Sequence, residues 1–522
     1  MAKDISGENR GPEGTRAFSR ALLRDLQALE RMLDAGMIES GIRRIGLEQE
    51  MFFVNRGWRP APVALEVLEE AEGPFTPELA LFNFEANIEP RTLDGHCFSD
   101  LEKRIDEVVS EARRAAKKVD SEVILTGILP TLTKSDMSLD NITPKARYHA
   151  LNDALSEMRG GEPQQLRIEG SDELLIQHDS VMLEACNTSC QVHLQVEADE
   201  FVKMYNACQL VTGPVLAASV NSPLLFGKLL WAETRIALFQ QSVDTRSGSV
   251  HMRELAPRVR FGDHWLQHSV TELFQEDMAR FRVLLTREVD EDPIQVLRDG
   301  GVPALQALQL NNGTVYRWNR PCYGVGGGKP HLRIECRYIP SGPTVLDEVA
   351  NSAFWIGSVL GVSDKYGDVA GQIDFEEAKA NFLTASRSGL RAGFRWLDGQ
   401  IHSAKDLIQN ELLPLAKVGL TKAGVDAAEI DEYLSVVRDR VETGNTGARW
   451  MRRSLTAMKH QGTRAERLVA VTSATVANQQ GRVPGHLWEP AALSDAGGWR
   501  LNYMRVEQFM TTSLFTVHED EL

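Results

Sequence analysis

Four short segments of the chain place acidic, imidazole or guanidinium side chains at every second residue, with apolar residues between them. The segments are residues 46–53 (GLEQEMFF), 83–89 (NFEANIE), 191–196 (QVHLQV) and 331–338 (HLRIECRY). Side chains alternate between the faces of a strand, so each segment predicts a strand with one apolar and one polar face. If the four strands share a sheet, their polar faces combine carboxylates, a histidine and arginines on one surface. Such a surface suits the binding of cations together with phosphate.

The acids of the first two segments are the strongest indication of a cation site. Glu48 and Glu50 share one face, and Glu85 and Glu89 share another. The simpler alternative is a solvated face of an antiparallel sheet. However, adjacent acids on one strand repel each other, and glutamate is a poor strand former. Bound cations would neutralise converging acids, and magnesium or manganese prefers carboxylate oxygens.

The last two segments add groups that bind metals or phosphate. His193 lies between Val192 and Leu194 and therefore faces the polar side, where it is either a ligand or an ordinary hydrogen-bonded side chain. In the fourth segment a carboxylate stands between two guanidiniums, which suits a metal beside a phosphate because arginine forks match phosphate oxygens. A surface salt-bridge ladder is the alternative. The residues on this face are His331, Arg333, Glu335 and Arg337.

Two other patterns do not carry the chemistry that they suggest. The glycine-rich stretch 324–330 (GVGGGKP) lacks the Ser or Thr that follows the lysine of a phosphate-binding loop, and a strand rather than a helix follows it. We expect residues 324–328 to form a loop over the site. Cys186 and Cys190 with His193 fit no familiar zinc spacing.

Composition excludes several classes of protein. Of 522 residues, 43% are hydrophobic and 25% charged, as in ordinary globular enzymes, and the net charge of −16 argues against nucleic acid as a partner. No apolar run approaches the roughly 20 residues that span a bilayer. The polar N-terminus lacks the apolar core of a signal peptide. The six cysteines form no disulfide pattern, which predicts reduced thiols and a cytoplasmic protein.

The order of the elements predicts an α+β fold. Strands alternate with amphipathic helices in the first part of the chain, and from about residue 344 the pattern is helical. We expect a flexible N-terminus (1–15), a catalytic α+β core (16–370) and a helical C-terminal part (371–522) packed on the core. Because no linker separates these parts, they are expected to form one unit.

With these residues identified, the chain resembles the glutamate–cysteine ligase family of the bacterial and plant type, carboxylate–amine ligases of the glutamine synthetase-like superfamily. The similar motifs are Gly46-x-Glu48-x-Glu50, Phe82-Asn83-Phe84-Glu85, Thr188-x-x-Gln191-x-His193, Ser222-Pro223, Glu335-x-Arg337 and Arg387-x-x-Leu390-Arg391-Ala392-Gly393. Each motif is weak alone, but their order over residues 40–460 is fairly specific. The chain departs from the family at Asn87-Ile88-Glu89-Pro90, where many members have Thr-Pro, so Glu89 has no assigned role.

The resemblance implies a curved, mainly antiparallel sheet with helices on its outer face, a helical C-terminal layer, and a concave face that binds ATP, Mg²⁺ or Mn²⁺ and an amino acid. The metal ligands implied by matching position are Glu48, Glu50, Glu85, His193 and Glu335. Arg337, together with Glu335, is implied as catalytic, neutralising the phosphate that is transferred. The candidates for substrate binding are Arg235, Arg317, Arg320 and Gln191. Residues 311–320 also look similar to a substrate segment of some members.

The activity implied is an ATP-dependent ligase that converts the γ-carboxylate of glutamate into an acyl phosphate, which an amine such as that of cysteine then attacks. The alternatives are a ligase for another amine, a phosphotransferase on a related sheet, a non-catalytic metabolite sensor and a metallohydrolase. The sequence does not identify the amine or the oligomeric state, although a homo-oligomer is possible.

Overall fold

The centre of the protein is a seven-stranded antiparallel sheet, described by a computed structural model over residues 11–244 and 257–497. Its strands run in the order β12-β13-β7-β1-β3-β2, and β4 pairs with the far end of β1. The α+β class and the curled antiparallel sheet expected from the sequence are confirmed. The bounds of these strands are β1 Arg44–Asn55, β2 Phe75–Pro77, β3 Asn83–Thr92, β4 Ser121–Ile124, β7 Cys190–Val196, β12 Asn319–Gly326 and β13 Lys329–Cys336.

The four alternating segments are four of these strands, and they are neighbours. In β1 the residues Ile45, Leu47 and Met51 are buried on one face, while Glu48 and Glu50 alternate with them. β7 lies between β1 and β13, so its own alternation joins the polar faces of both. One side of the sheet is therefore core, and the other side carries the polar groups.

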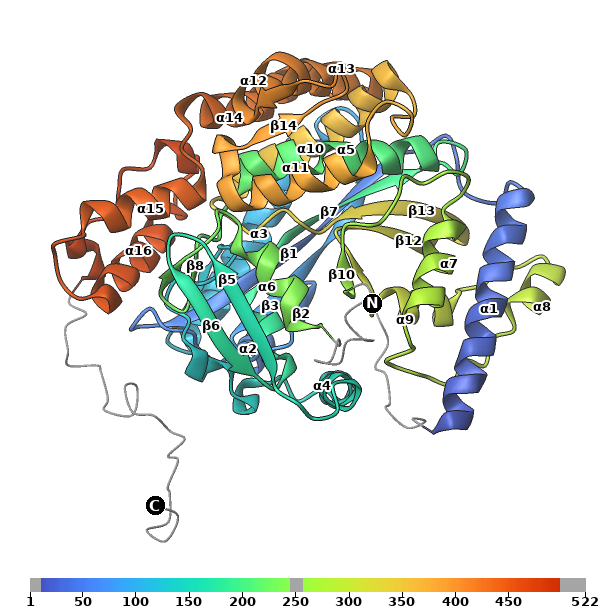
Figure 1. Ribbon diagram of the computed structural model, residues 1–522, viewed down its shortest axis with the longest axis horizontal. Coiled ribbons are helices and arrows are strands. Elements are labelled where there is room, and N and C mark those ends of the chain that lie inside the picture. The colour runs from blue at the N-terminus through green and yellow to red at the C-terminus, as the bar shows by residue number, and fades with distance from the viewer. Residues whose placement is uncertain (1–10, 245–256, 498–522) are drawn as a thin grey trace, which may run out of the picture.

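Helices cover the apolar side of the sheet. α3 packs on β3 and β4, and α10 packs on β7. α5 packs on α10 and on β12. Figure 1 shows α10 and α11 stacked with the later helices α12, α13 and α14 along one side of the molecule. The bounds are α3 Cys97–Lys118, α5 Phe201–Ser219, α10 Val345–Tyr366, α11 Phe375–Ser388, α12 Ala404–Leu407, α13 Leu413–Ala423 and α14 Ala427–Thr443.

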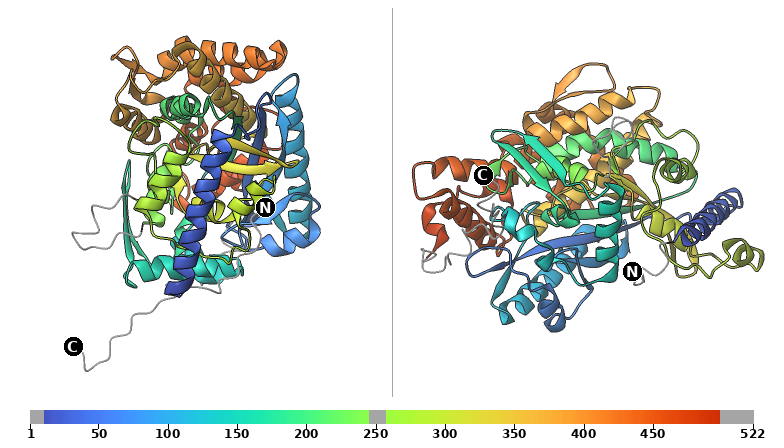
Figure 2. Two further views of the ribbon diagram at one scale, coloured as in Figure 1. Left: turned by 90° about the vertical axis from the view of Figure 1, so that its right-hand side faces the viewer. Right: turned by 60° about the horizontal axis from the view of Figure 1, so that its bottom comes forward.

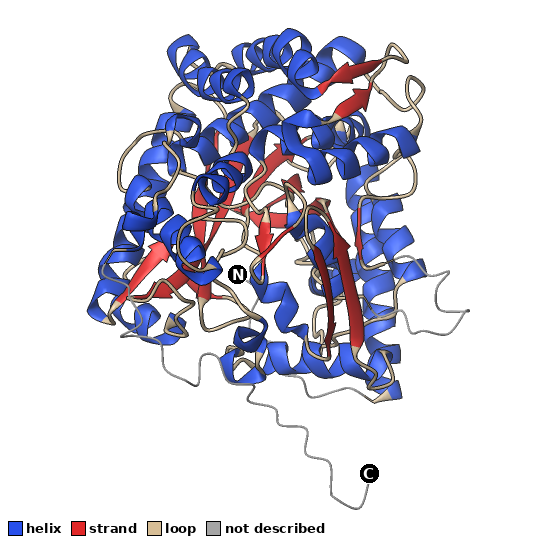
Figure 3. Ribbon diagram, turned by 60° about the vertical axis from the view of Figure 1, so that its left-hand side comes forward, coloured by secondary structure: helices blue, strands red, loops and turns tan. Residues whose placement is uncertain are grey.

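The remaining elements surround the polar side and the ends of the sheet. α1 packs at one edge of the molecule against α7, α8 and α9 (Figure 2), and Figure 3 shows the central strands enclosed by helices. The remaining helices are α1 Pro12–Asp34, α2 Ala64–Glu70, α4 Ala146–Met158, α6 Thr234–Ser242, α7 Thr271–Arg280, α8 Pro293–Arg298, α9 Gln306–Asn312, α15 Gly447–Ala457 and α16 Arg464–Asn478. The two-stranded pairs are β5 Gln164–Glu169 with β6 Glu173–His178, β8 Leu224–Leu225 with β9 Lys228–Leu229, β10 Val259–Arg260 with β11 Tyr316–Arg317, and β14 Gly393–Arg395 with β15 Ile401–Ser403.

The expected segments of the chain coincide only partly with the observed elements. Residues 1–10 and 498–522 lie outside the described residues, and α1 begins at Pro12, within the segment expected to be flexible. After residue 371 the described part is helical apart from the β14–β15 hairpin. The division itself stays a prediction. Among the described helices, none combines the length and apolar character that crossing a bilayer requires.

The glycine-rich stretch is not the loop that its composition suggests. Residues 324–326 continue β12, Gly326 pairs with Lys329, and only Gly327 and Gly328 form the turn into β13. Both turn residues have positive φ (57° and 78°), a conformation that two-residue hairpin turns require and glycine adopts without a steric penalty. The expectation of a loop over the site was wrong because the glycines serve the hairpin turn.

Candidate active site

Strand register places the polar side chains of the four segments next to one another. Glu50 lies directly opposite Glu85, and Glu48 lies opposite Gln191. On the other side of β7, His193 lies opposite Glu335, which in turn lies opposite Arg320 on β12. Opposite residues in an antiparallel pair have Cβ atoms about 5 Å apart, so these groups form one continuous surface across the strands.

One end of this surface is acidic, and we call Glu50, Glu78 and Glu85 the acid cluster. Glu78 follows β2 and joins the acids of β1 and β3. Burial raises the pKa of Glu78 to about 8, with further repulsion from Glu50 and Glu48. Burial and the charges of Glu48, Glu78 and Glu50 also raise the pKa of Glu85 well above its ordinary value. These carboxylates lack enough positive charge nearby, which is the environment that a divalent cation would complete.

Within the acid cluster, the Glu50 carboxylate is held in place by hydrogen bonds from β7 and the residue before it. Its carboxylate accepts hydrogen bonds from Gln191 Nε2 at 2.7 Å and from the Ser189 backbone N–H at 2.6 Å. Burial still raises its pKa, although Arg235 and Arg337 oppose this rise. The Oε1 atom of Gln191 accepts a hydrogen bond from Arg337 Nη1 at 2.8 Å. Gln191 therefore connects Glu50 with Arg337 and fixes their relative position.

The other end of the surface pairs a carboxylate with guanidiniums, and we call Arg320, Glu335 and Arg337 the arginine cluster. Glu335 is fully buried. Its Oε2 accepts hydrogen bonds from Arg320 Nε at 2.9 Å and Nη2 at 2.6 Å, and its Oε1 accepts one from Arg337 Nη1. Burial works against the charged form, but the two guanidiniums hold the pKa of Glu335 well below its ordinary range. This carboxylate remains ionised.

Glu48 and His193 join the two clusters. His193 Nε2 lies 3.1 Å from Glu48 Oε1, and His193 Nδ1 lies 4.0 Å from Glu335 Oε2. Burial alone would raise the pKa of Glu48, but the hydrogen bond and charge of His193 outweigh it and the pKa is lowered. His193 is 8% exposed, and its Nδ1 has no hydrogen-bond partner among the described residues. A buried nitrogen without a partner, facing a carboxylate, is suited to hold a cation.

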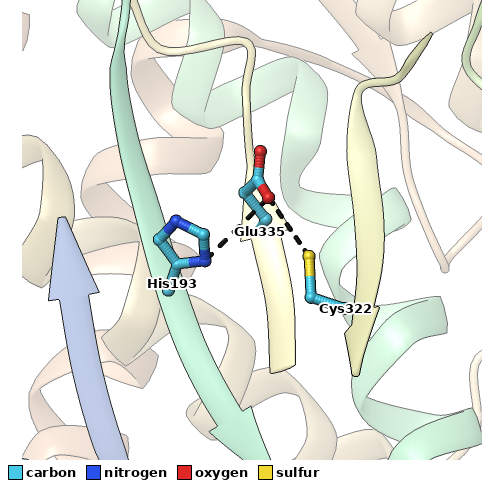
Figure 4. Close-up of side chains that lie close together, drawn as sticks. All are labelled: His193, Cys322 and Glu335. Carbon is cyan, nitrogen blue, oxygen red and sulfur yellow. Dashed lines mark hydrogen bonds and ion pairs between the residues drawn. The ribbon is translucent and has the colours of Figure 1, made fainter. Parts of the chain in front are cut away.

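Figure 4 shows a residue that the sequence analysis did not single out. Cys322 of β12 points at Glu335, with its Sγ 3.1 Å from Glu335 Oε2, and His193 lies on the other side of the same carboxylate. Donor atoms of these three residues all lie within 4.8 Å of one another. The alternation Arg320-x-Cys322 on β12 carries this signal, but proline and glycine around it obscure the strand pattern.

Two further charged groups border the acid cluster and were also missed. Glu184 lies in a short 3₁₀ segment, Val181–Cys186, where burial raises its pKa to about 7, while Arg337 and Arg147 oppose this rise. Arg147 stands at the start of α4 and also attracts Glu78. Neither residue belongs to a strand, so no alternation marks them. Only the packing of these segments over the polar face brings them to the site.

Two of the proposed substrate residues have partners inside the protein. Arg317 is buried in an ion pair with Asp277 and Glu276 of α7, apart from the two clusters. Arg235 is buried and donates to the backbone carbonyls of Tyr338 at 3.1 Å and Arg337 at 3.3 Å. Arg235 thus supports the backbone that carries Arg337. By contrast, Arg320 and Gln191 lie within the site.

Glu89 and His331, which share the alternating pattern, do not join the clusters. The register between β1 and β3 shifts between Ile45 and Leu47, so the β3 residues near Glu89 lose their regular pairing. Glu89 is exposed and pairs with Arg104 at 3.3 Å. His331 hydrogen-bonds with Arg333 near the hairpin turn, and burial together with that guanidinium lowers its pKa to about 4.

Comparisons with known proteins identify the family and the fold. The model of glutamate–cysteine ligase family 2 (GCS2) matches residues 44–472. Glutamate–cysteine ligase from Francisella tularensis, solved in complex with AMP, has a similar structure (TM-score 0.51, 12% identity, 88% of this chain and 94% of that one). A bifunctional glutathione synthetase from Pasteurella multocida is also similar (TM-score 0.50, 12% identity, 88% of this chain and 55% of that one). At this identity the likeness concerns the fold. No match to the chain is found among curated proteins.

Proposed function

Because the chain belongs to glutamate–cysteine ligase family 2, we propose that it is an ATP-dependent carboxylate–amine ligase that joins the γ-carboxylate of glutamate to an amine, in the first place that of cysteine. The observation that carries the proposal is the pairing of an acid cluster with an arginine cluster on one sheet face, which includes Glu50, Glu85, Glu335 and Arg337 of the motifs similar to the family's. The AMP bound to the Francisella tularensis enzyme supports nucleotide binding by this fold.

The proposed reaction has two steps. The γ-carboxylate oxygen of glutamate attacks the γ-phosphorus of ATP and ADP departs, leaving a γ-glutamyl phosphate. The amine nitrogen then attacks the acyl carbon, phosphate departs, and the amine proton is released. Both reactants of the first step are anions, so catalysis depends mainly on positioning and on neutralising charge.

The residues of the site divide this work between them. Glu48, Glu50, Glu78 and Glu85 would hold Mg²⁺ or Mn²⁺, which when bound would neutralise charge on the polyphosphate. Arg337 would stabilise charge on the phosphoryl group in transfer, with Gln191 and Glu335 fixing its guanidinium. Arg320 would keep Glu335 ionised and in place.

Amino-acid binding requires a cationic group for the α-carboxylate of the substrate. Arg147 lies beside Glu184 and Glu78 but forms an ion pair with neither of them. We assign it to the α-carboxylate of the amino-acid substrate. Arg235, already engaged by backbone carbonyls, supports the site from behind rather than contacting substrate.

Product analysis tests the function. Purified protein is incubated with ATP, Mg²⁺, glutamate and a panel of amines that includes cysteine, and ADP, phosphate and the amide product are measured. The ligase predicts ADP and amide in equal amounts, both dependent on glutamate and on one amine. ADP formation with phosphate transferred to an acceptor and no amide would identify a phosphotransferase instead, and amide formation without ATP would contradict the proposal.

A matched pair of variants on one strand gives the control. Glu85→Gln removes a member of the acid cluster and should abolish turnover, whereas Glu89→Gln changes an exposed acid four residues further along β3 and should not. Equal activity in the two variants would show that the acid cluster is not the metal site.

A further inference from the structure

A buried carboxyl group lies behind the acid cluster, on the core side of the sheet. Glu348, in the first turn of α10, is fully buried. It contacts Gln49 of β1, which is also fully buried and stands between Glu48 and Glu50 in the sequence, so that its side chain points to the opposite face. Polar side chains in an apolar layer cost free energy unless hydrogen bonds satisfy them. The contacts of this pair therefore indicate what it does.

One oxygen of Glu348 connects two segments that are distant in the sequence. Its Oε1 accepts hydrogen bonds from the side-chain amide of Gln49 (Nε2) at 3.0 Å and from the backbone N–H of Gly342 at 2.5 Å. Ser341 Oγ lies 3.4 Å from the same oxygen. Ser341 and Gly342 follow β13, and Gln49 belongs to β1. Glu348 therefore connects the strand that carries part of the acid cluster with the segment that follows the strand of the arginine cluster.

The same contacts hold the backbone carbonyl of Glu50. This carbonyl accepts hydrogen bonds from Ser341 Oγ at 2.9 Å and from Gln49 Nε2 at 3.0 Å. Gln49 Nε2 and Ser341 Oγ are themselves 3.0 Å apart. Because the Glu50 carboxylate extends from this backbone to the polar face, a shift of either partner would move a member of the acid cluster.

On the polar face, Gln191 connects the same two parts of the molecule. Its side chain donates to the Glu50 carboxylate at 2.7 Å and accepts from Arg337 Nη1 at 2.8 Å. β7, which carries Gln191, lies between β1 and β13. The acid cluster and Arg337 are thus connected twice, by Gln191 in front of the sheet and by Glu348 behind it. Displacement of a reacting group by about 1 Å can lower a rate about 100-fold, so these connections matter for the proposed reaction.

Two unpartnered oxygens indicate which form of the carboxyl group fits this place. Glu348 Oε2 and Gln49 Oε1 are both buried and have no hydrogen-bond partner within the described residues. Both are acceptors when Glu348 is ionised, but a proton on Oε2 supplies the donor that the pair lacks. Burial also raises the pKa of Glu348 to about 8, although the hydrogen bonds from Gly342, Gln49 and Ser341 oppose this rise. The neutral acid is therefore the form favoured at pH 7.

We propose that Glu348 is a positioning residue that acts as a neutral carboxylic acid paired with the Gln49 amide. In this pair Gln49 Nε2 donates to Glu348 Oε1, and Glu348 Oε2 donates to Gln49 Oε1. Through Gln49 and Ser341, Glu348 sets the backbone of Glu50 and, with it, the acid cluster relative to Arg337. The inference rests on the proposed function, which gives Glu50 and Arg337 their roles.

Mg²⁺ binding to the full-length protein tests this role without an assay of turnover. Isothermal titration calorimetry with Mg²⁺ alone compares the wild type with Glu348→Gln and Glu348→Leu. The glutamine keeps a neutral planar group that both donates and accepts, so the Mg²⁺ affinity should stay close to that of the wild type. The leucine leaves the Gln49 amide and the Gly342 N–H without an acceptor. The affinity should then fall about 10-fold or more, the loss typical when a group that orients metal ligands is removed.

Two further variants separate positioning from a general loss of stability. Asn351→Leu removes another buried polar group of α10, which hydrogen-bonds with Arg440 of α14, and it should lower the melting temperature but keep the Mg²⁺ affinity. Ser341→Ala removes one of the two donors to the Glu50 carbonyl and should weaken Mg²⁺ binding by less than Glu348→Leu. This milder variant decides the test if Glu348→Leu does not fold. Circular dichroism shows which variants are folded.

The outcomes separate this inference from the proposed function. The positioning role is overturned if Ser341→Ala and folded Glu348→Leu keep the wild-type Mg²⁺ affinity, if Glu348→Gln loses as much affinity as Glu348→Leu, or if the wild type binds no Mg²⁺. A loss in Asn351→Leu as large as that in Glu348→Leu also overturns it, because general destabilisation would then be the cause. An affinity that falls in Glu348→Leu and is kept in Glu348→Gln, in a protein that forms no glutamate-dependent amide, supports the positioning role and contradicts only the ligase.

Discussion

The two clusters on the polar face satisfy buried charge in opposite ways. In the arginine cluster, Glu335 is fully buried and keeps its charge because Arg320 and Arg337 donate to both of its oxygens. In the acid cluster, Glu78 and Glu85 lie among other carboxylates, and their pKa values are raised. In the first cluster, side chains of the protein itself neutralise the buried carboxylate. The second lacks such partners, and under the proposed function cations from solution would neutralise it.

In the proposed reaction, this difference would let one face bind two anionic reactants. A preformed guanidinium pair requires no reorganisation when charge develops on a phosphoryl group. An incomplete acid cluster, by contrast, stores repulsion that protonation or a bound cation would relieve. Removing an acid should therefore have opposite effects on stability at the two ends, and four predictions test this contrast.

The largest effect is expected for Arg337. Arg337→Gln removes the guanidinium that faces the proposed phosphoryl transfer, and kcat/KM should fall by about 10³-fold or more. Arg337→Lys keeps the charge but loses the planar fork, so it should recover only part of the activity. Steady-state ADP release measures both variants. Wild-type kcat/KM in Arg337→Gln would remove this residue from the mechanism.

Next in size is the loss of stability at Glu335. Glu335→Gln leaves two partly buried guanidiniums without their carboxylate, and breaking a buried pair in this way costs about 3 kcal/mol or more of unfolding free energy. Urea denaturation of the metal-free protein measures the change. An unfolding free energy equal to that of the wild type would mean that the ion pairs of the arginine cluster do not stabilise the fold.

The acid cluster should make the metal-free protein sensitive to pH. Because the folded-state pKa of Glu78 is about 8, above its ordinary value of 4.5, the folded protein binds more protons than the unfolded chain between these values. Stability of the metal-free protein should therefore fall as pH rises from about 5 to 8. Thermal denaturation with a chelator measures this fall, and added Mg²⁺ should reduce it. A stability that rises over this range would contradict the pKa shift.

The smallest effect distinguishes acids on one strand. Glu85→Gln removes repulsion and should raise the unfolding free energy of the metal-free protein by about 1 kcal/mol, while the stabilisation by Mg²⁺ decreases. Glu89→Gln should change stability by no more than about 0.5 kcal/mol, because its pair with Arg104 is exposed. Denaturation with and without Mg²⁺ compares the two. Destabilisation by Glu85→Gln would show that positively charged side chains of the protein already neutralise the acid cluster.

The residues whose shared sheet face was predicted from the sequence have a strand pattern in common. Glu48, Glu50, His193 and Glu335 alternate with buried apolar residues, and they meet because their strands are neighbours. Period-two alternation also predicts which side of the strand is core, since a shift by one residue would bury the acids. The same pattern included Glu89, however, and the local register shift between β1 and β3 takes that residue out of the site.

The surroundings of other charged residues depend on contacts between distant segments and could not be predicted from a local pattern. Arg317 stands in a segment rich in polar residues, but Asp277 of α7 binds it. Glu78, Glu184 and Arg147 lie outside the main strands and reach the site only because β2, the 3₁₀ segment and α4 pack over the polar face. Cys322 gains its meaning from the pairing of β12 with β13.

The sequence by itself determined the strands, their polar faces and the family to which the chain belongs, because alternation and motif order are local properties of the chain. The tertiary structure alone decided which carboxylates are neutralised by arginines and which lie among other acids with raised pKa values. The physical reason is that the energy of a charge depends on burial and on neighbours a few ångströms away. Those neighbours come from strands and loops far apart in the sequence, as His193, Cys322 and Glu335 show.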